Sequence, residues 1–356
     1  ESINLANDNQ KVRNESSFAD MSLFDRTDDL LLSREDVLER YPWFERGPGA
    51  TGLVWPSGEW TIEETVVLPT GLTIDIEPGA KIRIAEGKSV MSYSPINIDG
   101  TAAERIEITN IEGQGNFGTF AIIGRINSPD DLVIDNLVVK NGSEAEINGA
   151  YASGMFSVYR FNHIDLTNSE FHGSSSDDGL NIKYADVYMA NNLLKDNSAD
   201  AWDGDFVTGI AEKNLFIDNG NDSLDFSGSN LTVRYNHVIN SGDKCVSVGE
   251  GTTILIEDNY LDGCFIGIEV KDRSDATITN NAILNNEQVG INAYVKKIFF
   301  GEPTLTFFDN IMLNDTQISG LAPEGDLARN TTSGTLTQAR STNPWLSQVE
   351  KTILQP

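Results

Sequence analysis

The sequence has little positive charge, only two cysteines and no long apolar run. Its 356 residues include 25 lysines and arginines against 54 acidic residues, which gives a formal net charge of −29. A nucleic-acid-binding protein needs a basic surface, so this balance argues against that class. No run of 18 apolar residues is present, so we expect no transmembrane segment.

Two cysteines are too few to organise a chain of this length through disulfides. Cys245 and Cys264 fall on neighbouring repeats, offset by three positions, and we expect buried free thiols, with a disulfide between them as the alternative. The chain begins at Glu1 and shows no apolar leader. We therefore expect a secreted, periplasmic or cell-surface protein whose signal peptide has been removed, or a piece of a longer protein. We also expect the protein to be a monomer.

What the sequence does contain is a repeat of 22 residues. The segments DDGLNIK, ADAWDGD, NDSLDFS, DKCVSVG and FIGIEVK start at that interval, from Asp177 to Phe265. Apolar and polar residues alternate within each segment, which is the period of a β-strand. Two inward columns follow: Leu180, Trp202, Leu224, Val246 and Ile268, and Ile182, Gly204, Phe226, Val248 and Val270.

Asparagine marks a second fixed point of the repeat, at Asn192, Asn214, Asn236, Asn259, Asn281 and Asn310. Asparagine tolerates the left-handed backbone conformation and bonds to nearby main chain. We predict that these residues occupy a recurring bend and stack into an amide ladder.

These patterns predict an all-β fold, a single-stranded right-handed parallel β-helix with 22-residue coils stacked about 4.8 Å apart. We place the solenoid at 51–318. An N-terminal tail and capping helix would occupy 1–50, with Ser33 as N-cap and Pro42 ending the helix. A C-terminal capping tail would occupy 319–356, packing through 343–354. Insertions at 141–155 and 294–307 interrupt the repeat, and such loops often line a binding groove.

The strict register brings acidic residues together on one outward face. One column holds Asn181, Asp203, Asp225, Ser247, Glu269 and Asn292; a second holds Lys183, Asp205 and Lys271; a third holds Asp178, Asp200, Asp222 and Lys244, flanked by Asp177 and Asp243. Carboxylates stacked about 5 Å apart repel one another unless a cation intervenes. Oxygen ligands at varied spacing suit Ca²⁺. We therefore predict a calcium site among Asp177, Asp178, Asp200, Asp203, Asp205 and Asp222.

The segment DDGLNIK followed by DAWD resembles the calcium site of the family-nine pectate lyases, over about 60 residues. The resemblance implies Asp178 or Asp177, Asp200 and Asp203 as calcium ligands. Two departures stand out: Ala199 occupies the place of one ligand, and Asp225 occupies the place of the family's catalytic lysine.

We therefore expect a carbohydrate-active enzyme with an anionic polysaccharide substrate. The first hypothesis is a Ca²⁺-dependent lyase that cleaves a uronic-acid polymer by β-elimination, with Lys244 or Lys183 as the base. Because Lys244 ends the column of Asp178, Asp200 and Asp222, we predict that these carboxylates raise the pKa of Lys244. Lys271, Asn181 and, from the second insertion, Tyr294 would bind substrate.

Two alternatives remain open. A glycoside hydrolase could pair Asp203 with Asp225 at about 5 Å, or Asp178 with Asp222 near 9.6 Å, the retaining and inverting separations respectively. A non-enzymatic adhesin or glycan-binding module would use Ca²⁺ only to stabilise the coils.

Overall fold

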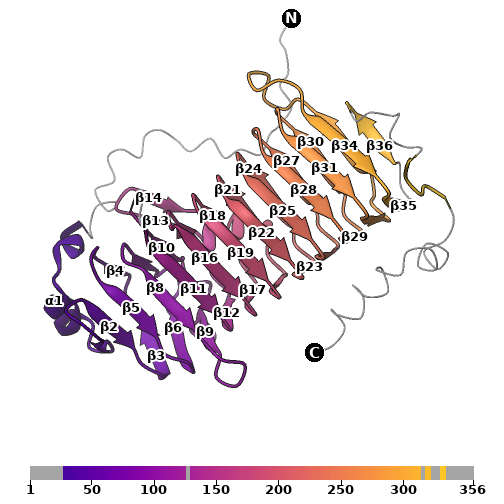
Figure 1. Cartoon of the computed structure of the whole chain (residues 1–356). Coiled ribbons are helices and arrows are strands. Elements are labelled where there is room, and N and C mark those ends of the chain that lie inside the picture. Colours follow the sequence, from indigo (N-terminus) through magenta and orange to yellow (C-terminus); the bar gives the residue numbers. More distant parts are fainter. Residues whose placement is uncertain (1–26, 126–128, 314–316, 322–328, 334–356) are drawn as a thin grey trace, which may run out of the picture.

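The computed structural model describes residues 27–125, 129–313, 317–321 and 329–333, which form one elongated stack of coils (Figure 1). Three long sheets run side by side along the stack. The first sheet consists of β1 (Glu45–Arg46), β2 (Gly52–Trp55), β5 (Thr73–Ile76), β8 (Ile96–Asp99), β11 (Asp131–Asp135), β16 (His163–Thr167), β19 (Asp186–Ala190), β22 (Thr208–Glu212), β25 (Asn230–Arg234), β28 (Thr253–Glu257), β31 (Asp275–Thr279) and β34 (Thr304–Phe308).

The second sheet carries the acidic columns and is called the acidic sheet below. It consists of β4 (Val66–Leu68), β7 (Val90–Ser92), β10 (Phe120–Ile123), β15 (Gly154–Tyr159), β18 (Asp178–Lys183), β21 (Asp200–Asp205), β24 (Leu224–Ser227), β27 (Lys244–Gly249), β30 (Ile266–Lys271), β33 (Val289–Tyr294) and β36 (Ile318–Gly320).

The third sheet consists of β3 (Gly58–Ile62), β6 (Ala80–Ile84), β9 (Ile106–Asn110), β12 (Leu137–Lys140), β17 (Glu170–His172), β20 (Leu193–Lys195), β23 (Leu215–Ile217), β26 (His237–Ile239), β29 (Tyr260–Asp262), β32 (Ala282–Leu284) and β35 (Ile311–Leu313). Each full coil gives one strand to each sheet. The predicted all-β solenoid is therefore confirmed; the domain boundaries at 51 and 318 stay predictions.

The register of the acidic sheet follows the 22-residue repeat without a slip over four coils. Asn181 pairs with Asp203, Asp203 with Asp225, and Asp225 with Ser247, all in parallel. The inward residues between them fill a continuous core. Trp202 is fully buried there, with its ring edge-on to Phe226 at 4.9 Å, so its assignment to the core is confirmed.

The asparagine ladder is confirmed and extends one step further than predicted. Each buried side-chain amide donates to the next Oδ1 at 2.9–3.1 Å, from Asn192 through Asn310 to Asn330. The left-handed backbone, however, falls on the residue before each of the six predicted ladder asparagines, as at Lys213 and Tyr235. The ladder amide is already committed to hydrogen bonds with the neighbouring coils, so the preceding residue makes the bend.

A short helix covers the N-terminal end of the core, as predicted. The helix α1 (Arg34–Arg40) begins with a capping box between Ser33 and Asp36, and its Val37 is buried in the main core. A 3-10 helix, η3 (Thr27–Leu31), precedes it. Among the described residues, no helix has the length and apolar character needed to cross a bilayer. The C-terminal cap expected at 343–354 and the N-terminal tail lie outside the described residues.

The expectation of free thiols is wrong, because Cys245 and Cys264 form a disulfide. Cys245 lies in β27, whereas Cys264 lies in the bend before β30. That bend brings the two Cα atoms to 5.6 Å despite the offset in the repeat, a separation typical of disulfides.

Candidate functional site

The site is built at the start of the strands of the acidic sheet, where main-chain donors fix two aspartates. The N–H of Asp222 donates to Oδ1 of Asp200 at 2.8 Å, and the Asn221 amide donates to the same oxygen at 2.7 Å. One coil further, the N–H of Lys244 donates to Oδ1 of Asp222 at 2.9 Å. The repeat thus orients each carboxylate through the backbone of the following coil.

Asp200, Asp222 and Asp225 form a close cluster, the aspartate triplet. One carboxylate oxygen from each lies within 4.8 Å of the others. Oδ1 of Asp225 is buried and has no hydrogen-bond partner, and the same holds for Oδ2 of neighbouring Asp178. Buried carboxylate oxygens without donors are costly unless they are protonated or bind a cation. The triplet therefore has the chemistry of an oxygen-ligand metal site.

The carboxylates around the triplet hold their protons more tightly than ordinary aspartates. Burial, with the charges of neighbouring acids, raises the pKa of Asp178 to about 7, and burial with the charge of Asp225 raises that of Asp222 to about 7. Burial and adjacent carboxylates also raise the pKa values of Asp200 and Asp203 well above the usual range. The cluster binds protons near neutral pH when no cation is present.

Two lysines flank the triplet on its C-terminal side. Lys244 Nζ lies 3.5 Å from Oδ1 of Asp222, 3.9 Å from Glu269 and in an ion pair with Asp243. Lys271 is 6% exposed and donates from Nζ to Ser247 Oγ at 2.8 Å. For both lysines burial lowers the pKa, but the surrounding carboxylates outweigh it and the pKa is raised. The expected effect of the column on Lys244 is thereby confirmed, and both side chains are ammonium ions in the protein alone.

A second group lies on the N-terminal side of the triplet. Lys183 Nζ pairs with Asp205 at 2.7 Å and lies 3.9 Å from Asp203. The Asn181 amide donates to Oδ2 of Asp203 at 2.5 Å, while its own Oδ1 is buried without a partner. Asp203 and Asp205 are thus engaged by protein donors, and the metal-binding cluster includes neither of them.

The structure brings some of the site residues expected from the sequence together and separates the others. Asp200 and Asp222 are in the triplet with Asp225, which we had expected to be catalytic rather than a ligand. Asp178 stands beside it, and the charge of Asp225 is one of the causes that raise its pKa. Asp177 is exposed, and Tyr294, half-buried in β33, pairs with Lys271 one coil beyond the lysines. The ligand set implied by the pectate-lyase resemblance, Asp178, Asp200 and Asp203, shares only Asp200 with the triplet.

Sequence reasoning missed an aromatic pair at the edge of this face. Tyr184 and Phe206 directly follow β18 and β21, both in the left-handed conformation, and their rings stack at 4.9 Å while about half exposed. Gly228 takes the next position, where a side chain would collide with the Phe206 ring. The 22-residue spacing of Tyr184 and Phe206 was the available signal. An exposed aromatic pair beside a charged sheet face is suited to contact the apolar faces of sugar rings.

A family model and one solved structure with a TM-score above 0.5 agree with the fold. A family model described as a right-handed β-helix region matches residues 204–334. A polygalacturonase of Saccharomyces cerevisiae is 27% identical over 179 residues, which is 46% of this chain and 46% of the relative, so the match spans about half of that protein. Among solved structures, the A-module of a mannuronan C-5 epimerase of Azotobacter vinelandii has a TM-score of 0.54 at 11% identity, covering 88% of this chain and 94% of its own. An alginate lyase from Paenibacillus sp. has a TM-score of 0.37 at 14% identity, covering 72% and 93%.

The chain is a right-handed parallel β-helix protein. The predicted handedness is thereby confirmed along with the coil stacking. A cluster of acids and lysines on one sheet of the solenoid defines its candidate site.

Proposed function

We propose that this protein is an extracellular or periplasmic carbohydrate-active enzyme, a polysaccharide lyase that uses Ca²⁺ to cleave a uronic-acid polymer. One observation carries the proposal: three aspartates, each buried or half-buried, have oxygens within 4.8 Å of one another and lie beside two largely buried lysines on one face of a β-helix. The sequence relative named as a polygalacturonase supports a polyuronate as substrate.

The triplet Asp200, Asp222 and Asp225 would hold the ion, because its three carboxylates bring oxygens within 4.8 Å of one another and Oδ1 of Asp225 has no hydrogen-bond partner. A bound Ca²⁺ would neutralise these acids and the carboxylate of the sugar, which acidifies the proton alpha to that carboxylate. This assignment replaces Asp178 and Asp203 of the resemblance-based set with Asp222 and Asp225.

Lys244 is the group best placed to remove the proton. Its Nζ lies beside Asp222 and Glu269 and is 13% exposed, so it meets both the triplet and the surface. Elimination transfers the alpha proton to the base, forms a carbon–carbon double bond and expels the glycosidic oxygen of the next sugar. Because the surrounding acids raise the pKa of Lys244, the amine becomes a base only when their charge is reduced. Lys271 stays an ammonium ion and would pair with the substrate carboxylate.

A hydrolase is the second candidate, and the pKa values of two acids favour it. Asp178 and Asp222 occupy one column two coils apart, and each has a pKa raised to about 7. A carboxyl group that is half protonated near neutral pH can donate a proton to a leaving group. Two coils correspond to roughly 9.6 Å along the stack, at the upper limit of the inverting range.

The deciding experiment incubates the purified protein with polygalacturonate and with alginate, in Ca²⁺ or in EDTA. A lyase produces ultraviolet absorbance from the unsaturated sugar, and EDTA abolishes it. A hydrolase produces new reducing ends without that absorbance. Stabilisation by Ca²⁺ with no turnover of any polymer would contradict both and indicate a binding module.

Matched variants assign the activity to the triplet. Asp225→Asn should abolish turnover, whereas Asp275→Asn, an exposed aspartate in β31 of the first sheet, should leave it unchanged. Full activity of the Asp225 variant would exclude this cluster as the site.

A further inference from the structure

The outer face of the acidic sheet changes character towards its N-terminal end. There the outward residues are apolar and buried under other parts of the chain, in a cluster separate from the main core. Its members are Val67, Met91, Ala121, Ile123, Ile147, Ala152 and Tyr159. These apolar residues and the segments packed on them take the place of the polar face at Asp203 and Asp225. A polymer lying along the sheet is therefore blocked at this end by the covering segments.

A hairpin supplies much of that cover. The insertion predicted at 141–155 forms the antiparallel strands β13 (Ala145–Ile147) and β14 (Ala150–Ala152), which project beside β10 (Figure 1). Ile147 and Ala152 are buried against the sheet, and Leu30 from η3 packs on the same cluster. The Tyr151 hydroxyl donates to Glu144 at 2.8 Å, which links the hairpin to its own base.

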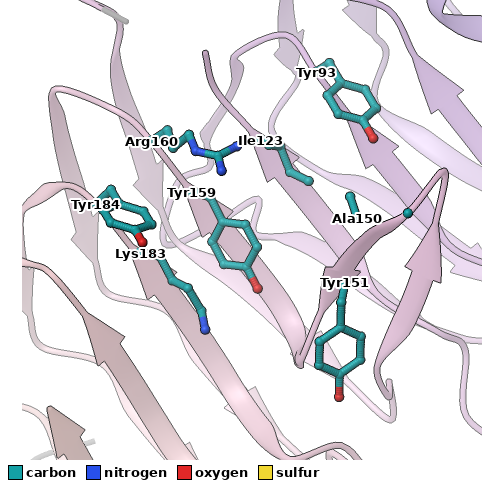
Figure 2. Close-up of a pocket in the computed structure, with 9 residues that line it drawn as sticks. Tyr93, Ile123, Ala150, Tyr151, Tyr159, Arg160, Lys183 and Tyr184 are labelled. Atoms are coloured by element: carbon teal, nitrogen blue, oxygen red, sulfur yellow. The ribbon is translucent and has the colours of Figure 1, made fainter. Parts of the chain in front are cut away.

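A pocket of about 330 Å³ lies between the hairpin and the sheet. One outward column lines it from successive coils, formed by Tyr93, Ile123, Tyr159 and Lys183. Figure 2 shows these side chains facing the hairpin strand that carries Ala150 and Tyr151. The volume is near the lower end of the range for small-molecule sites, about 300–1,000 Å³, and suits one sugar ring rather than a long chain.

The charge in this pocket is positive. Its lining contains Lys183 and Arg160 and no acidic residue. Within the described part of the chain, Arg160 has no carboxylate within ion-pair distance. Lys183 lies 5.8 Å from the ring centre of Tyr159 and pairs with Asp205 on its other side. An anionic group on a sugar would find one free guanidinium and one shared ammonium here.

The pocket adjoins the acidic cluster directly. Lys183 belongs to both: it lines the pocket, and it lies 3.9 Å from Asp203, the register partner of Asp225. From β18 to β24 is two coils, or roughly 9.6 Å. A sugar bound in the pocket would therefore place a glycosidic linkage over the triplet, one or two sugar units along the polymer.

We propose that this pocket binds the terminal sugar of an anionic polysaccharide, with Arg160 and Lys183 facing its carboxylate, so that the enzyme acts from a chain end. The inference rests on the proposed function for the cleavage step, whereas binding in the pocket does not require it. The hairpin keeps the rest of the polysaccharide away from the N-terminal coils. The polysaccharide therefore extends over Asp225 towards Tyr294.

The test first measures binding without turnover. Isothermal titration calorimetry with galacturonate, mannuronate and their trimers should detect binding, with neutral glucose as the reference. Arg160→Gln and Lys183→Gln should each weaken uronate binding about tenfold, the loss expected for one charge-assisted hydrogen bond. Lys195→Gln, a partly exposed lysine in β20 on the third sheet, should bind as the wild type does.

The second measurement follows polymer cleavage by viscosity and product size. Action from a chain end gives mono- to trisaccharides from the first time points while the viscosity barely falls. A rapid loss of viscosity with long early products would overturn the proposal and leave the proposed function intact. Uronate binding that depends on Arg160 without any turnover would support the pocket and refute the proposed function. Absence of uronate binding would overturn the pocket proposal.

Discussion

The main-chain N–H of Asp222 donates to Oδ1 of Asp200, at 2.8 Å, across one coil of the solenoid. This bond occupies one oxygen of Asp200 and aims the carboxyl group along the stack. Lys244 repeats the arrangement on Asp222. Since the backbone supplies these donors, the β-helix can hold acidic side chains in register without using arginines, which leaves the remaining oxygens available to a cation or to substrate.

Ca²⁺ should stabilise the protein through the aspartate triplet. In the absence of metal, three carboxylates repel one another within 4.8 Å. At free Ca²⁺ of 100 times its dissociation constant, the free energy of unfolding should rise by about 2.7 kcal/mol, visible as a higher Tm in calorimetry. Asp225→Asn should raise the metal-free Tm and abolish the calcium shift. An undiminished shift in this variant, relative to Asp275→Asn, would contradict the assignment.

The metal-free protein should lose stability as the pH rises towards neutrality. Folding raises the pKa of Asp178 and Asp222 from 3.8 to about 7, so the folded state binds protons that the unfolded state has released. Their stabilising contribution is complete below about pH 4 and is lost as the pH passes through 7. The loss is of the order of a few kcal/mol. Urea unfolding from pH 4 to 8 in metal-free buffer measures it.

The variant Asp222→Asn isolates this effect, because the amide does not titrate. Its stability should fall less steeply over the same pH range than that of the wild type. A stability profile that rises with pH in the metal-free wild type would show that these acids are ionised without cost.

The 22-residue register accounts for most of what the sequence could predict. It places the Cα atoms of Asn181, Asp203 and Asp225 in neighbouring coils, as observed. It does not specify rotamers, and so it did not single out Asp225 as a partner of Asp200 and Asp222. Those two lie at or before the start of a strand, where backbone donors turn the side chains towards the next coil.

Features outside the repeat could not be read from it. The hairpin at Ala145–Ala152 lies in an insertion that has no counterpart in other coils, and its apolar cluster joins Met91, from two coils earlier, with Tyr159, from the strand that follows the hairpin. The Cys245–Cys264 disulfide depends on the path of a bend, which alters the separation that sequence offset suggests. Periodicity predicts the stacked strands, whereas insertions and bends depend on tertiary contacts.

Lys244→Gln should separate catalysis from metal binding. The proposed base is lost, so turnover of the polyuronate that the wild type cleaves should fall by about 10² to 10⁴. The backbone N–H at position 244 still donates to Asp222, and the triplet is unchanged, so the calcium shift in Tm should persist. Lys195→Gln is the matched control. Near wild-type turnover by Lys244→Gln would assign the proton transfer to another group.

The asparagine ladder should carry a large share of the stability of the central coils. Asn236 accepts at Oδ1 from the backbone N–H and side-chain amide of Asn214, both at 3.0 Å, and donates to Asn259 and to the carbonyl of Ala211. Asn236→Ala leaves these buried groups without partners, which should cost about 3 kcal/mol in urea unfolding. Asn162→Ala removes one exposed amide bond to Asp131 and should change stability by less than about 1 kcal/mol. Equal losses in the two variants would show that the ladder is no stronger than a surface contact, because water would then be replacing its hydrogen bonds.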